Sequence, residues 1–173
     1  GLAPNVVPEE AEVYYYVRHP NVEGVKELFN RVVKTAEGAA RGTETQMDFE
    51  VMHGNYPLMP NKALSVVIDE ELHKIGGITY SNEENKFAEE IYQTLLNPDR
   101  PIGDQENIQP LELSQTKGST DVGDVSWKVP TSGVRIATWV PGTSSHSWQA
   151  VAAGGTTIGT KGSTLAAKVL ANS

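Results

Sequence analysis

The fold class is predicted from AEVYYYVRHPNVEGVKELFNRVVKTAEGAARGTETQMDFEVMH, residues 11–53, in which the spacing of apolar residues changes twice. Residues 11–19 alternate, are rich in β-branched and aromatic side chains and lie between prolines, which predicts a strand. Residues 21–42 predict a helix that starts at an Asn cap and ends at Gly42. Residues 43–53 alternate again and predict a second strand. The apolar positions of the helix recur every three or four residues: Val22, Val25, Leu28, Phe29, Val32, Val33, Ala36 and Ala40.

The rest of the chain continues this mixed pattern after a Gly/Pro/Asn-rich connection at residues 53–61. Apolar periodicity predicts three more helices, at residues 64–75, 87–95 and 158–171. The apolar run VRIATWVP, residues 134–141, predicts a buried strand, and the proline-rich, charged stretch 97–122 predicts a long surface loop. The sequence therefore predicts an α/β fold.

Composition limits the classes of function. The 173 residues and 38% hydrophobic content suffice for a buried core, and the formal net charge is −8. Lys and Arg residues are scattered without a basic face, so no nucleic-acid partner is expected. No apolar run approaches ~20 residues and no signal segment opens the chain, so we expect no membrane partner and a cytoplasmic location. Because the chain has no cysteine, His, Asp and Glu are the only side chains left to bind a transition metal.

Two polar clusters have two interpretations each. In GSTDVGDVSW, residues 118–127, Asp121 and Asp124 either bind a cation or orient a histidine, or they bond the backbone of a turn. In GTSSHSWQ, residues 142–149, His146 is either a loop residue that caps a helix over residues 147–153 or bonds a carbonyl, or a metal ligand at the carboxyl end of a strand.

A third cluster joins Asn5, through a predicted turn, to Arg18 in the tyrosine-rich strand. A lone Arg on a strand is ordinarily a solvated surface residue. Near an Asn, its planar guanidinium can instead clamp a carboxylate bidentately. No GxSxG, HExxH or Walker-type glycine loop is present, so no motif supports a serine hydrolase, an HExxH zinc protease or a P-loop protein.

Three motifs in order carry a resemblance to a known family: APNVVPEEAEVYYYVRHP before an amphipathic helix, GSTDVGDVSWKVP, and GTSSHSWQ. They resemble the amidohydrolase branch of the di-metal aminoacylase and carboxypeptidase family, metallopeptidase family twenty. The resemblance covers nearly the whole chain. It implies a catalytic α/β domain that holds two zinc ions, interrupted by a smaller α/β lid domain that forms a dimer contact.

The resemblance also implies a role for each segment. Residues 1–56 resemble the second half of the lid (dimerisation) domain, and residues 58–173 resemble the C-terminal part of the catalytic domain. His146 falls on the family's C-terminal metal-ligand histidine, and Asn5 and Arg18 fall on lid positions that hold the substrate's terminal carboxylate. The GSTDVGDVSW motif lines the family's active-site cleft, but no ligand role carries over to its two aspartates.

The implied activity is metal-dependent cleavage of an amide bond in an N-acyl amino acid or dipeptide-like substrate of the p-aminobenzoyl-glutamate type. The family's other metal ligands and its general base would precede Gly1, and the opening GLAPNVVPEE resembles a turn between strands, so we expect the chain to be a fragment. The full-length enzyme would hold two divalent ions, zinc or manganese. The fragment alone would be inactive, contain no catalytic residue and bind no metal. The alternative is a non-catalytic interaction or dimerisation module derived from the family.

Overall fold

The computed structural model describes residues 3–113 and 120–173. These residues form six α-helices and one short 3₁₀ helix, and contain no β-strand. They divide into two compact units: unit 1, residues 3–58 with 120–124, and unit 2, residues 59–113 with 125–173. The assignment of residues 1–56 to a lid and of residues 58–173 to a catalytic domain stays a prediction.

The predicted α/β class is wrong for the residues described, which are all-helical. A β-strand exists only when its backbone bonds to a neighbouring strand, and alternation of side-chain types does not supply that neighbour. Residues 11–19, 45–53 and 134–141 have the expected alternating or apolar pattern, yet each has irregular backbone without ladder pairing in the described part of the chain. These segments have the side-chain pattern of strands, but no neighbouring strand pairs with them among the described residues.

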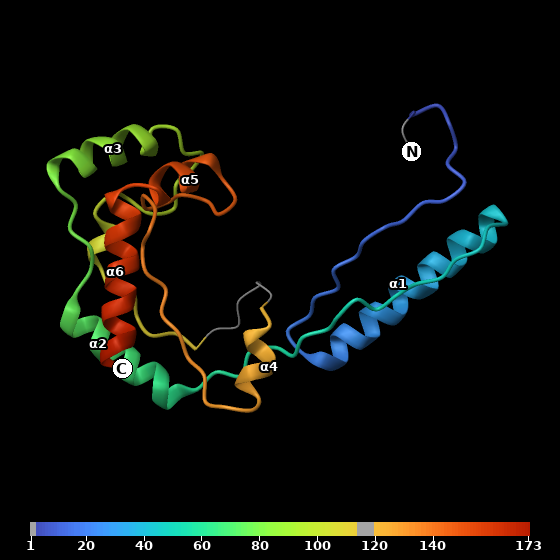
Figure 1. Ribbon diagram of the computed structural model, residues 1–173, viewed down its shortest axis with the longest axis horizontal. Coiled ribbons are helices and arrows are strands. Elements are labelled where there is room, and N and C mark those ends of the chain that lie inside the picture. The colour runs from blue at the N-terminus through green and yellow to red at the C-terminus, as the bar shows by residue number, and fades with distance from the viewer. Residues whose placement is uncertain (1–2, 114–119) are drawn as a thin grey trace. The chain divides into compact units, whose positions relative to one another are not determined.

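Unit 1 is built on α1, Val22–Thr43, which confirms the helix predicted over residues 21–42 (Figure 1). Asn21 caps its start, with its side-chain oxygen accepting from the Gly24 N–H at 2.8 Å. The His19 ring lies so close to this first turn that a Cβ on Gly24 would be 2.1 Å from His19 Nδ1. A larger side chain at position 24 would therefore displace the imidazole from this place.

The chain reverses after α1 at Glu44, which has a left-handed backbone with φ of 56°. The next segment runs back beside the helix, since Thr45 N–H donates to Ala40 O at 3.0 Å and the Phe49 ring meets Phe29 edge-on at 5.7 Å. Even so, none of the 22 residues of α1 is buried. The apolar stripe predicted from the sequence is present but only partly covered.

Unit 2 contains the hydrophobic core. α6 packs against both α2 and α5 (Figure 1). The helices predicted over residues 64–75, 87–95 and 158–171 are confirmed, although the second both begins and ends earlier than predicted. The elements of the unit are α2 (Lys62–Ile75), α3 (Asn82–Tyr92), η1 (Asp104–Glu106), α5 (Trp148–Gly154) and α6 (Thr157–Asn172). The core side chains are Ile78, Tyr80, Ala88, Ile91, Val140, Ala153 and Ile158.

Gly162 sets the close approach of α6 to the irregular segment 134–141. A Cβ at this position would lie 2.4 Å from Ala137 O, so a glycine lets the helix rest directly on backbone. The remaining helix, α4, spans Val122–Ser126. No helix in the part of the chain described here is both long and apolar enough to cross a lipid bilayer.

Candidate functional site

His146 lies in the turn before α5 and has a left-handed backbone with φ of 59°. Its side chain is exposed, and the described residues provide no hydrogen bond to its imidazole. Ser147 caps α5 instead, with its Oγ accepting from the Ala150 N–H at 3.2 Å and donating to Ser144 O at 2.7 Å. The helix predicted after His146 is confirmed, and the interpretation of His146 as its capping residue is wrong.

The backbone that carries His146 is fixed by its surroundings. Val140, just before the turn, is almost fully buried, and its carbonyl accepts from the Thr143 N–H at 3.1 Å. Gly142 has φ of 80°, and a Cβ there would lie 2.6 Å from Pro98 Cβ. Gln149 Nε2 donates to Thr94 O at 3.3 Å from the far side of the turn. The exposed imidazole therefore stands on a well-anchored loop.

The donor set around His146 does not by itself fit a two-metal centre. Three or more His, Cys, Asp or Glu side chains placed to hold a metal ion do not occur within residues 3–113 and 120–173. A catalytic zinc site takes three protein ligands for each ion. His146 can supply one nitrogen donor, and any further ligands would have to come from outside the described residues.

Asn5 and Arg18 both belong to unit 1. Asn5 lies in a turn closed by the Val6 N–H donating to Ala3 O at 3.2 Å, and its side chain is exposed. The Arg18 guanidinium is also exposed and sits 5.6 Å from the centre of the Tyr16 ring, within cation–π range. No hydrogen bond joins Asn5 to Arg18 in the described structure, so the predicted carboxylate clamp stays a prediction.

The aspartates of the GSTDVGDVSW motif, whose residues 118 and 119 lie outside those described, differ in their contacts. Asp124 Oδ1 accepts from the Tyr56 N–H at 2.8 Å, and a Cβ on Gly123 would meet Tyr56 O at 2.0 Å. The Asp121 carbonyl accepts from the Asp124 N–H at 3.1 Å as α4 begins. The Asp124 carboxylate thus holds backbone 68 residues away, and both interpretations of the two aspartates stay predictions.

Sequence reasoning missed two residues in this region. Ser126 is buried, and its Oγ accepts from the Met59 N–H at 2.8 Å, a contact across 67 residues that no local pattern signals. Trp148 begins α5 with its indole largely exposed. The signal for Trp148 was present in the sequence, because GTSSHSWQ places a large aromatic residue two positions after the candidate ligand.

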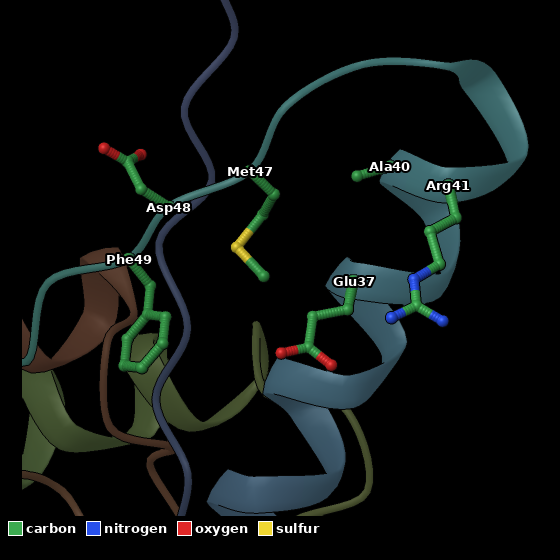
Figure 2. Close-up of a pocket in the computed structure, with 6 residues that line it drawn as sticks. All are labelled: Glu37, Ala40, Arg41, Met47, Asp48 and Phe49. Atoms are coloured by element: carbon green, nitrogen blue, oxygen red, sulfur yellow. The ribbon is translucent and has the colours of Figure 1, made fainter.

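Two open grooves lie away from the predicted site residues. The first, of about 450 Å³, borders the C-terminal half of α1 (Figure 2) and is lined by Glu37, Ala40, Arg41, Met47, Asp48 and Phe49. The second, of about 330 Å³, runs between residues 75–79 and the face of α6 that carries Lys161 and Lys168. Neither groove is lined by Asn5, Arg18 or His146.

Sequence comparison relates the chain to curated hydrolases. It is 34% identical over 196 residues to a subunit of p-aminobenzoyl-glutamate hydrolase from Escherichia coli (strain K12), an alignment that covers 99% of this chain and 41% of that protein. It is 27% identical over 131 residues to the Xaa-Arg dipeptidases of Mus musculus and Homo sapiens, covering 75% of this chain and 24% of each relative. The chain thus spans less than half the length of these relatives. No protein-family model and no solved structure matches. The resemblance drawn from the three motifs is confirmed.

Proposed function

Because the chain is a partial-length homologue of a p-aminobenzoyl-glutamate hydrolase subunit, we propose that it is part of a metal-dependent amidohydrolase. Its substrate would be an N-acyl amino acid or a dipeptide-like molecule of the p-aminobenzoyl-glutamate type. The observation that carries this proposal is 34% identity sustained over 99% of the chain. An alignment of this extent includes both the segment with Arg18 and the segment with His146.

The names of the relatives point to one kind of scissile bond. p-Aminobenzoyl-glutamate and an Xaa-Arg dipeptide each contain an amide whose nitrogen belongs to an amino acid with a free carboxylate. An enzyme for such substrates gains from a cation that holds this carboxylate and thereby orients the amide. Arg18 suits the role because its guanidinium is exposed and fork-shaped, and Asn5 can add an amide donor.

We assign His146 as one nitrogen ligand of the metal centre that the family resemblance implies. In support, its imidazole is exposed, has no hydrogen-bond partner among the described residues, and is carried by an anchored loop. A ligand of this kind needs a fixed backbone so that its nitrogen is presented in one direction.

The dimer contact through residues 1–56 is proposed only from the resemblance.

The test uses the gene product at its full length, with hydrolysis of p-aminobenzoyl-glutamate and bound zinc measured together. His146→Asn is the informative variant, because Asn tolerates the left-handed backbone at this position while removing the imidazole. Loss of an outer-shell partner already lowers metal affinity or activity about 10- to 100-fold, so loss of a ligand should lower both by about 100-fold or more.

The matched control is His53→Asn, an exposed histidine of unit 1 that should leave both readings unchanged. Full activity in the His146 variant would refute the ligand assignment. A parent protein that cleaves neither p-aminobenzoyl-glutamate nor an Xaa-Arg dipeptide, and binds no zinc or manganese, would refute the amidohydrolase proposal. That outcome would support the non-catalytic interaction module.

A further inference from the structure

Trp148 combines high exposure with a fixed position. Its side chain is 60% exposed, although an indole is among the side chains most often used to bury apolar surface. The opposite face of α5 is packed, with Ala150 6% and Ala153 0% exposed. The helix is therefore seated in unit 2 by its small residues while it presents its largest one outward.

The start of α5 is held from two sides. Ser147 caps the helix through the Ala150 N–H, and Gln149 Nε2 donates to both the carbonyl and the hydroxyl of Thr94, at 3.3 and 3.2 Å. A side chain on such a backbone loses little freedom on binding a ligand, since the main chain is already ordered and an indole has two side-chain torsions. Trp148 is thus preorganised for contact.

The separation between Trp148 and His146 is short by covalent geometry. Two residues along a chain span at most about 7 Å between Cα atoms. In an amide with an aromatic acyl group, the ring is bonded directly to the carbonyl carbon at which the amide would be cleaved. If His146 is one ligand of a metal ion that would polarise this carbonyl, a side chain near His146 is well placed to bind the ring.

We propose that the Trp148 indole stacks on the aromatic acyl group of the substrate and makes the enzyme selective for aroyl over aliphatic acyl amides. This inference rests on the proposed function and names the acyl side of its substrate.

The experiment compares p-aminobenzoyl-glutamate with N-acetyl-glutamate as substrates of the full-length gene product. Trp148→Ala should raise KM for the aroyl substrate by about three- to tenfold, the range expected for one aromatic pair, and leave KM for the acetyl substrate unchanged. Trp148→Phe should retain most of the preference, because a smaller ring still stacks. The inhibition constant of free p-aminobenzoate is a second measurement, and it should rise in the Trp148→Ala variant.

Val151→Ala is the matched control, since it removes an apolar side chain that is 79% exposed one turn further along α5. It should change neither substrate's KM. An equal rise on both substrates in Trp148→Ala, or no rise on either, would overturn the inference and leave the proposed function standing. A parent enzyme that cleaves neither substrate and binds no metal would overturn both.

Discussion

Lys161 Nζ lies 2.5 Å from Glu84 Oε2 and so ties α6 to the first turn of α3 across 77 residues of chain. The Glu84 side chain is only 7% exposed, and its Oε2 also accepts from the Ser81 N–H at 2.7 Å. Lys161 donates in addition to Thr79 O at 3.0 Å. One buried carboxylate thus completes the capping box of α3 and anchors the C-terminal helix.

Removing the Lys161 ammonium group should destabilise the fold. Breaking a buried ion pair costs about 3–5 kcal/mol, but the Lys161 side chain is 42% exposed, so water would offset part of the loss. We expect Lys161→Met to lower the free energy of unfolding by about 2 kcal/mol in urea denaturation. Lys74→Met is the control, because the Lys74 ammonium that pairs with Glu71 is solvated and its loss should have a clearly smaller effect. If both substitutions lowered the free energy of unfolding equally, the Lys161–Glu84 pair would contribute no more to stability than the exposed Lys74–Glu71 pair.

The same carboxylate should make stability depend on pH. Burial alone raises the pKa of Glu84, but hydrogen bonds from Lys161, Thr157 and the Ser81 N–H outweigh it and lower the pKa from 4.5 to about 2. Because the pKa is lower in the folded state, the contribution is complete above pH 4.5 and is lost as the pH falls towards 2. Between about pH 6 and pH 3, the unfolding midpoint of the parent should therefore fall further than that of Glu84→Gln. Parallel pH profiles would contradict this assignment.

Replacing a glycine by alanine should lower stability at Gly162 in α6 and raise it at Gly38 in α1. Gly162→Ala puts a methyl 2.4 Å from Ala137 O, and overpacking of this kind costs about 1–3 kcal/mol. Gly38→Ala in α1 meets no atom within 4 Å and should stabilise its helix by about 0.5–1 kcal/mol. Thermal unfolding of the two variants measures whether each substitution raises or lowers stability. A neutral Gly162→Ala would mean that α6 can move away from segment 134–141.

Asp124 offers a test between holding backbone and binding a cation. Asp124→Asn keeps the Oδ1 acceptor for the Tyr56 N–H and removes the charge, whereas Asp124→Ala removes both. If the aspartate only holds backbone, Asn should keep near-parental stability and Ala should lose about 1–2 kcal/mol. Loss of stability with Asn equal to that with Ala, accompanied by loss of bound metal, would instead support a cation-binding role.

Arg18 should affect substrate affinity more than turnover. If it holds the substrate's carboxylate in both ground and transition states, Arg18→Ala should raise KM for p-aminobenzoyl-glutamate by about tenfold with little change in kcat, in line with a hydrogen bond to a charged group. Arg31→Ala, which removes an exposed arginine of α1, is the control. An unchanged KM in the Arg18 variant would remove this residue from the substrate-binding site.

The features that the sequence predicted well are encoded locally. α1 starts directly after the predicted Asn21 cap, because that signal lies next to the helix's first turn. It ends at Thr43, close to the predicted Gly42, but the left-handed residue that follows is Glu44 rather than a glycine. The short helix after His146 was predicted for the same reason, since the serine that caps it is adjacent. Periodicity over three or four residues is enough to place such elements.

The features that the sequence did not predict depend on partners far along the chain. Segments 11–19 and 45–53 have strand-like composition, but a strand requires a neighbour that composition cannot name. The Asp124 contact with Tyr56 spans 68 residues, and Lys161 reaches Glu84 across 77. For the candidate site, the sequence singled out His146 but not its left-handed backbone.

α1 combines an apolar stripe with the absence of any buried side chain along its length. Its amide hydrogens are consequently protected mainly by the helix's own bonds, because the segment that contains Thr45 and Phe49 covers the stripe only in part. Hydrogen–deuterium exchange should label α1 much sooner than α6, whose Val169 and Ile158 are completely buried. Any molecule that covers the stripe would then be detected, and its footprint mapped, by the amides of α1 whose exchange it slows.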